Sequence, residues 1–364
     1  MEFPIYPTKK QGLTEKFDLN SPSGRHKYFT SKASREIEDI KNYLDNGTFI
    51  AFMLAKKAAG KGTYSQMFQE LVGTDRVKLI SVGDLVRLTN ETLVNDPKGK
   101  EKLTNELKDT YRGYISLDEA LDSVLSRSTE KITIPTELII ALIELEIAKN
   151  PNKGIFIDGF PRTLDQVSYS LYFRQIMNFR DDPDFFILID IAEEIIEARI
   201  SSRAICSLCK TTRNPKLLPT SKIEYDKKTD EFYLICDNPT CDGFGKERLI
   251  PKEGDELGIE AIRDRLNNDG QLIEKALSLH GIPKILVRNH IPVSELDKFD
   301  DYELTPEYSY EYDEKTEKVT VKETPWIIKD DNGVESHSLL AAAALLNLIK
   351  QMHKILIEGK DPTE

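Results

Sequence analysis

The sequence predicts an α/β fold in which a parallel β-sheet carries helices on both faces. Short apolar runs of strand length alternate with helical segments, which is typical of such sheets. One of these runs is followed by a turn of small residues and then a helix. The chain has 364 residues, enough for a large core with one or two insertions. We expect strands at 48–55, 77–82, 154–157, 185–191 and 326–328.

The two ends of the chain differ in their predicted secondary structure. Residues 1–33 are rich in Pro, Gly, Ser and Lys without a sustained period, so we expect an irregular arm. Ile37, Ile40 and Leu44 recur at helical spacing before Asn46-Gly47, which predicts a helix that stops there. Apolar periodicity also predicts buried helices at 137–148 and about 336–357.

Charge and hydropathy exclude several classes of protein. The 50 Lys and Arg residues against 62 Asp and Glu residues give a net charge of -12, which disfavours a surface that coats nucleic acid. A local basic cleft for small anions remains compatible with this charge. We see no amino-terminal signal-like run and no stretch of about 18 apolar residues, so we expect a cytoplasmic protein without a membrane partner.

Residues 55–63 read A-K-K-A-A-G-K-G-T and lie between an apolar run and a helical pattern from about residue 64. Such a turn points several backbone N–H groups at one place, where they can cradle phosphate oxygens. Lys61 would reach the β- and γ-phosphates, and Thr63 would lie near a magnesium ion. Ala55 replaces the first Gly of the usual G-x-x-x-x-G-K pattern, so a plain strand-to-helix turn is the alternative.

Two further segments follow in order, S-V-G-D-L-V-R at 81–87 and D-G-F-P-R-T-L-D-Q at 158–166. Together with G-K-G-T, their order and spacing resemble the adenylate kinase family. The resemblance covers roughly 48–203, 255–275 and the carboxy-terminal strand and helix. It implies a P-loop kinase core made of 34–203, 255–282 and 326–364, with an acceptor-binding region at about 84–150. It also implies a lid at 204–254, and it leaves the arm and a hairpin-containing insertion at 283–325 unexplained.

The resemblance implies roles for individual residues. The expected ATP-binding residues are Ala59, Gly60, Lys61, Gly62, Thr63 and Arg199, and the expected acceptor-binding residues are Val82, Arg87, Gly159, Arg162 and Gln166. The expected catalytic residues are Lys61, Arg87, Asp158, Arg162, Arg203 and Arg265. Asp158, with Asp84, would hold magnesium through water, because carboxylates at strand ends face the ligand edge of such sheets. Arginines suit phosphates through bidentate donation.

Two positions depart from the family pattern. Val82 stands where the family usually has Thr, which removes a hydroxyl and leaves the choice of acceptor base open. A lid arginine has no clear counterpart, and Arg248 or Lys252 would take its place.

All four cysteines fall in one segment, as Cys206-x2-Cys209 and Cys236-x4-Cys241. In a protein of this expected compartment, this clustering favours a metal over disulfides. Four thiolates in tetrahedral geometry suit a structural zinc ion, with reduced free thiols as the alternative. The pattern E-Y-D-x-K-T, at 224–229 and again at 311–316, predicts a β-hairpin turning at each Asp-to-Thr stretch.

The functional hypothesis is reversible phosphoryl transfer from magnesium-bound ATP to AMP, giving two ADP. Its expected partners are these nucleotides alone, and the expected state is a monomer. Alternatives are a nucleoside monophosphate kinase acting on UMP or CMP, or a catalytically weakened nucleotide-binding protein, suggested by Ala55 and Val82. A zinc-ribbon protein that binds nucleic acid is a further alternative, which the net charge disfavours.

Overall fold

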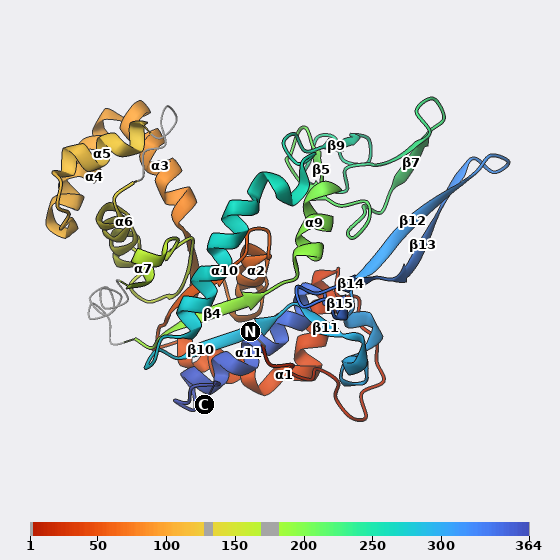
Figure 1. Cartoon of the computed structure of the whole chain (residues 1–364), viewed down its shortest axis with the longest axis horizontal. Helices are drawn as coiled ribbons and strands as arrows, with labels where there is room; N and C mark the ends of the chain where they lie inside the picture. The colour runs from red at the N-terminus through yellow and green to blue at the C-terminus, as the bar shows by residue number, and fades with distance from the viewer. Residues whose placement is uncertain (1–2, 127–133, 169–181, 364) are drawn as a thin grey trace.

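The computed structural model describes residues 3–126, 134–168 and 182–363 (Figure 1). Its central sheet is parallel and five-stranded, in the order β10-β4-β1-β3-β2, so the predicted α/β class is confirmed. The strands are β1 (Ile50–Ala55), β2 (Val77–Ser81), β3 (Gly154–Asp158), β4 (Asp184–Asp190) and β10 (Lys284–Arg288). None of the described helices is both long and apolar enough to cross a lipid bilayer.

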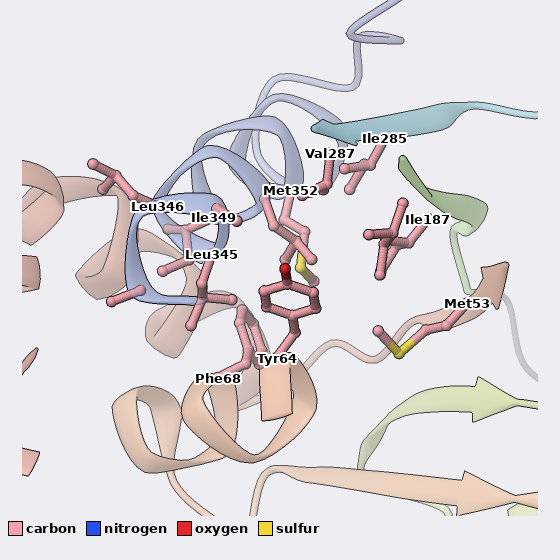
Figure 2. Packing of buried hydrophobic residues seen from close by; sticks show 14 of the residues in the cluster. Met53, Tyr64, Phe68, Ile187, Ile285, Val287, Leu345, Leu346, Ile349 and Met352 are labelled. Atoms are coloured by element: carbon pink, nitrogen blue, oxygen red, sulfur yellow. The ribbon is translucent and has the colours of Figure 1, made fainter. Parts of the chain in front are cut away.

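Alternation along the buried strands directs side chains into two apolar cores, one on each face of the sheet. Ala51 and Met53 of β1 join the core covered by α1 (Pro22–Leu44), α2 (Lys61–Val72) and α11 (Ala341–Leu356). Figure 2 shows this core, with Tyr64 of α2 packed near Met352 of α11. The neighbours of Ala51 and Met53 in β1 enter the opposite core, whose helices are α3 (Val82–Asn95), α4 (Pro97–Thr110), α5 (Leu117–Leu125), α6 (Thr136–Ala148) and α10 (Arg263–Leu277).

The strand expected at 326–328 does not belong to the central sheet, and this prediction was wrong. The outer strand beside β4 is β10, which lies inside the segment expected to be an insertion. Every residue of β10 is buried, as both-face coverage requires, whereas β14 (Ile327–Lys329) alternates exposed and buried residues. β14 pairs antiparallel with β15 (Glu335–Ser338) in a separate sheet that also contains β11 (His290–Pro292). For this reason the last helix begins at Ala341 rather than near residue 336.

The irregular arm is shorter than expected, because α1 begins at Pro22. Ser21 caps this helix by accepting a hydrogen bond from the backbone N–H of Gly24 at 3.1 Å, and Pro22 occupies its first turn. Non-helical dihedrals at Ala33 interrupt the helix, so its apolar period is not continuous through this point. The remaining arm, which we call the N-terminal arm, is residues 3–21.

A buried carboxylate ties the N-terminal arm to the segment after β11. Glu303, in the short helix η4 (Asp301–Glu303), is completely buried and lies 2.7 Å from Nζ of Lys32. It also accepts hydrogen bonds from the hydroxyls of Tyr28 and Thr8. The arm, α1 and η4 therefore form one braced unit.

We predict that Lys32→Met lowers the free energy of unfolding by about 3 to 5 kcal/mol, because it leaves the Glu303 carboxylate buried without its cation. Lys27→Met, at an exposed position of the same helix, is the matched control and should change stability by no more than about 0.5 kcal/mol. Denaturant unfolding of both variants measures the difference. A loss below about 1 kcal/mol for Lys32→Met, as for an exposed pair, would contradict the brace.

Both predicted hairpins are present and turn where expected. One joins β7 (Ile223–Asp226) to β8 (Glu231–Leu234), and the other joins β12 (Pro306–Asp313) to β13 (Lys318–Pro325). The two lie side by side (Figure 1), with the rings of Tyr225 and Tyr312 stacked at 4.4 Å and an ion pair of 2.8 Å between Lys227 and Glu317. The hairpin of the insertion thus packs along the hairpin of the cysteine-containing segment.

Candidate functional site

A glycine-containing turn connects β1 to α2 at the carboxyl edge of the sheet. Gly60 precedes the helix with φ of 95°, a left-handed conformation that favours glycine. Lys61 opens the helix, three residues earlier than the pattern suggested. Its ammonium group donates to the carbonyl of Ala55 at 3.2 Å and lies 3.5 Å from Oδ1 of Asp158 at the end of β3. A cation and the first backbone N–H groups of a helix therefore meet at one place, as phosphate binding requires.

A small pocket beside this turn collects several of the predicted residues, and we call it the loop pocket. Lys61, Asp158, Gly159, Arg162 and Arg265 all line it, although they come from α2, the end of β3 and α10. Gly159 has φ of 89°, so the chain turns sharply after Asp158. Three cations thus converge with the Asp158 carboxylate on a single pocket.

Asp269 also lines the loop pocket, although no motif in the sequence pointed to it. Its Oδ2 accepts a hydrogen bond of 2.9 Å from the backbone N–H of Lys57 and lies 3.9 Å from Nε of Arg265. Burial raises the pKa of Asp269, and the positive charge of Arg265 partly offsets this effect. The only signal in the sequence was its spacing of four residues from Arg265, which puts both on one helical face.

A second cavity, of about 530 Å³, also borders the turn between β1 and α2, and we call it the large cavity. The predicted residues Ala59, Gly60, Thr63, Arg199 and Arg203 line it.

The two arginines of the large cavity come from the end of α9 (Glu193–Ser201) and the residues after it. Arg199 donates to the carbonyl of Ala58 at 3.2 Å and to Oδ1 of Asn289 at 3.3 Å, and desolvation lowers its pKa. Arg203 makes a bidentate contact with Asp255, at 2.5 and 2.7 Å. Lys252 donates its backbone N–H to the carbonyl of Arg203, whereas Arg248 pairs with Asp226 and Glu231 of the β7–β8 hairpin.

The predicted acceptor residues do not all gather at the loop pocket. Gln166 is buried, with Oε1 accepting from the backbone N–H of Arg162 at 2.7 Å and Nε2 donating to Thr136 at 3.1 Å. Val82 is buried, and its Cβ would lie 3.5 Å from a Cβ placed on Gly159. Both therefore lie beside the turn after β3.

Arg87 lines a separate cavity of about 510 Å³ between α3 and α5, which we call the helix pocket. It forms an ion pair with Asp84, and both side chains are 67 % exposed. A hydrogen bond from Ser81 and the contact with Arg87 lower the pKa of Asp84. The structure thus places neither Arg87 nor Asp84 on the wall of the loop pocket.

The four cysteines form a compact cluster in the cysteine-containing segment. Their sulfur atoms all lie within 4.8 Å of one another, with Sγ distances of 3.8 Å between Cys206 and Cys241 and 3.7 Å between Cys209 and Cys236. Tetrahedral zinc with Zn–S bonds of about 2.3 Å separates its sulfur ligands by about 3.8 Å, so the geometry fits this ion. No other cluster of metal-ligand type occurs among the residues that were described.

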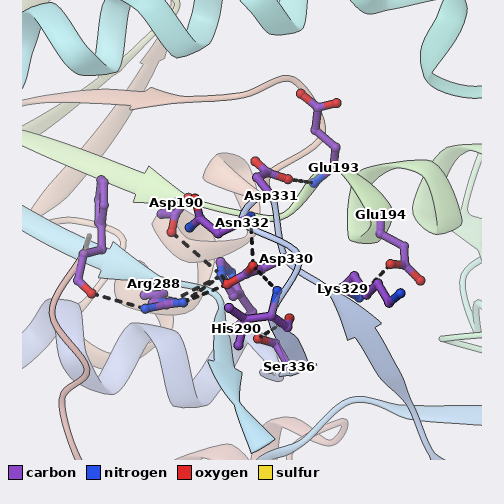
Figure 3. Close-up of polar contacts among 12 residues, drawn as sticks. Asp190, Glu193, Glu194, Arg288, His290, Lys329, Asp330, Asp331, Asn332 and Ser336 are labelled. Atoms are coloured by element: carbon purple, nitrogen blue, oxygen red, sulfur yellow. Dashed lines mark hydrogen bonds and ion pairs between the residues drawn. The ribbon is translucent and has the colours of Figure 1, made fainter. Parts of the chain in front are cut away.

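A charged network that the sequence did not reveal holds residues 55–63, which we call the phosphate turn after the role expected for it, from the side of β4 and β10. Lys56 lies 2.5 Å from Oδ2 of Asp331 and 3.3 Å from Oε1 of Glu193. Asp331 also accepts the backbone N–H of Glu193, and the neighbouring Asp330 pairs with Arg288 at 3.3 Å (Figure 3). The turn between β14 and β15 therefore fixes the first lysine of the phosphate turn.

Comparisons with known proteins point to one group of enzymes, although no family model matches the chain. The chain is 25% identical over 228 residues to an adenylate kinase of Thermotoga neapolitana, covering 57% of this chain and 91% of that protein. It is 24% identical over 228 residues to an adenylate kinase of Thermotoga maritima, with the same coverage of 57% and 91%. It is 27% identical over 214 residues to a probable UMP-CMP kinase 2 of Arabidopsis thaliana, covering 57% of this chain and 70% of that protein.

Proposed function

We propose that this chain, a divergent member of the adenylate kinase and nucleoside monophosphate kinase family, transfers the terminal phosphoryl group of ATP to AMP and forms two ADP reversibly. Relatives named adenylate kinase and UMP-CMP kinase support the broader activity of a nucleoside monophosphate kinase. The observation that carries the proposal is the convergence of Lys61, Asp158, Arg162 and Arg265 on the loop pocket beside the phosphate turn.

In this proposal the protein acts by positioning and charge neutralisation. The N–H groups at the start of α2 and the ammonium of Lys61 hold the donor phosphates, and Arg162 and Arg265 balance the charge that spreads over the transferring group. An oxygen of the acceptor phosphate attacks in line, so no side chain acts as a covalent nucleophile. Lys252 would approach from the lid and Arg87 from the helices as these parts close on the substrates, whereas Arg203 lies directly before the lid.

Magnesium would enter with ATP, and the residues at the loop pocket fit it. Asp158 offers carboxylate oxygens, the ligand type magnesium prefers, within 3.5 Å of Lys61. Magnesium supplies charge neutralisation between the donor phosphates. Thr63 lines the large cavity rather than the loop pocket, and Asp84 would contribute only after leaving its pair with Arg87.

Two alternatives remain close to this proposal. A preference for UMP or CMP is favoured by the valine at position 82 and by the UMP-CMP kinase relative. A weakened nucleotide-binding protein is favoured by Ala55 and by Ala58, which adopts φ of 66° without being glycine.

We predict that AMP is the best acceptor and that Val82→Thr increases the preference for AMP over UMP, CMP and GMP. One restored hydrogen bond contributes about 1 kcal/mol, so kcat/KM ratios should change by roughly fivefold. Val77→Thr is the matched control, since Val77 is another buried valine, on β2 and outside the expected acceptor-binding region. Steady-state assays with magnesium, ATP and each monophosphate measure the ratios. A higher kcat/KM for UMP or CMP than for AMP in the unmodified protein would show that the acceptor assignment is wrong.

A further inference from the structure

The large cavity extends beyond the segments that the family resemblance covers. At one end lie Ala59, Gly60 and Thr63 of the phosphate turn. Elsewhere its wall includes Leu19 and Arg25, from the N-terminal arm and the first turns of α1, and Trp326, which follows the inserted hairpin. Residues of the arm, of the start of α1 and of the segment directly after the inserted hairpin therefore line the same space as the phosphate turn.

We infer that the N-terminal arm and Trp326 form the part of the donor site that receives the nucleoside of the triphosphate, so that Arg25 and Trp326 determine donor selectivity. This inference rests on the proposed function, because it assigns the large cavity to the donor rather than to the acceptor. It gives residues outside the family motifs a direct part in binding.

The shape and chemistry of the large cavity suit a nucleoside. Its volume of about 530 Å³ is within the usual range for small-molecule sites of about 300–1,000 Å³. Leu217, Trp326 and Leu340 contribute apolar surface, and Arg199 contributes a planar cation, both of which pack well against the face of a base. With phosphates at the turn, the nucleoside would extend toward these walls.

Arg25 provides polar recognition at this end. Its Nη2 lies 3.0 Å from Glu70, and its Nη1 donates to the carbonyl of Asn20 at 3.1 Å. Its Nε is buried and out of reach of a ligand, so a contact with a ligand would come from Nη1 or Nη2. Because a guanidinium group only donates, the remaining N–H groups favour ligand atoms that accept, such as the ring nitrogens or carbonyl of a purine.

The braced unit around Glu303 keeps this wall in place. Tyr28 and Lys32, which contact Glu303, follow Arg25 in the same helix. The ring of Phe17 in the arm also packs edge-on against that of Tyr302, at 5.8 Å between centroids. These contacts hold the arm, α1 and η4 together without any ligand.

The first test compares donor and acceptor kinetics in Arg25→Met. We expect KM for ATP to rise about tenfold, because the variant loses a charge-assisted hydrogen bond to the donor. The ratio of kcat/KM for ATP to that for GTP should also change. KM for AMP should stay within about twofold. Arg76→Met is the matched control, because Arg76 is also ion-paired but lines none of the three cavities. Glu70→Gln removes only the ion pair, and an effect as large as that of Arg25→Met would contradict the role assigned to Arg25.

The second test uses Trp326, which is the only tryptophan in the sequence. We expect saturating ATP, added without acceptor, to quench or shift its fluorescence, and AMP alone to leave it unchanged. Trp326→Phe should lose this signal and raise KM for ATP more than KM for AMP. An unchanged spectrum with ATP, together with unchanged donor kinetics in Arg25→Met and Trp326→Phe, would overturn the inference.

These outcomes separate the inference from the proposed function. If ADP forms normally and KM for ATP is unchanged in both Arg25→Met and Trp326→Phe, the inference fails and the kinase assignment stands. If ATP changes Trp326 fluorescence but no monophosphate is phosphorylated, the kinase assignment fails and the donor site stands.

Discussion

Lys61→Ala is expected to lower kcat by at least about 10³-fold, and Arg162→Ala is expected to lower it by a similar, slightly smaller factor. Removing one preorganised donor from a developing negative charge costs about 10²- to 10³-fold, and these side chains also carry full charge. Lys61 lies within 3.5 Å of Asp158 in the loop pocket, where the donor phosphates would lie. Its side chain belongs to neither apolar core, so the fold should be retained.

A lysine elsewhere on the sheet controls for charge and surface effects. Lys78, on β2, is half-exposed and makes a distant ion pair of 3.9 Å with Glu146. Lys78→Ala should therefore keep nearly full activity. Turnover and circular dichroism of all three variants make the comparison. Near-normal turnover in Lys61→Ala or Arg162→Ala would remove the catalytic assignment of that residue.

The purified protein is expected to carry about one zinc ion per chain, bound by the four cysteines in a closed tetrahedral site. Structural zinc contributes about 10 kcal/mol or more of apparent binding free energy in small zinc domains, so its loss should unfold the cysteine-containing segment locally. The two central apolar cores include none of these cysteines, so they should melt separately. Limited proteolysis after chelation should therefore cut residues 204–254 before the rest.

Elemental analysis of Cys236→Ser/Cys241→Ser tests the ligand set. Ser207→Ala, in the same turn as Cys206 and Cys209, is the control and should retain the metal. Burial raises the pKa of the Cys236 thiol to about 12, whereas hydrogen bonds with Thr211 lower that of Cys209 to about 6. A bound cation would stabilise all four as thiolates. Zinc retained fully by the double variant, or absent from the reduced native protein, would contradict the site.

The sequence was sufficient for the central sheet except at its edge. Apolar runs located β1, β3 and β4, because these strands are buried on both faces and read as continuous hydrophobic stretches. A shorter run located β2, an edge strand that is only partly buried. β10 begins with Lys284 and ends with Arg288, so its apolar centre is only three residues long. Trp326 and Ile328 resembled a core strand because both are buried in the apolar core under α1, α2 and α11, although β14 does not pair with the central sheet. Local periodicity shows neither that the short apolar run of β10 belongs to the central sheet nor that the run at 326–328 does not.

The candidate site divides in the same way. Residues fixed by a local turn, such as Gly60, Lys61 and Asp158, lie where the motifs place them, at the carboxyl edge of the sheet. Contacts between segments far apart in the chain were missed, including Asp269 with the N–H of Lys57 and Asp331 with Lys56. These contacts depend on how α10 and the β14–β15 turn pack against the phosphate turn. Residue spacing within a single segment does not predict such packing.

Production of ADP from ATP and AMP in the presence of magnesium tests the central claim most directly. Quantifying all three nucleotides by chromatography should show two ADP formed for each AMP consumed, with the reverse reaction starting from ADP alone. The reaction should depend on Lys61 and survive Lys78→Ala. Binding of ATP without phosphorylation of AMP, UMP, CMP or GMP would contradict the claim and identify the chain as a nucleotide-binding protein without kinase activity.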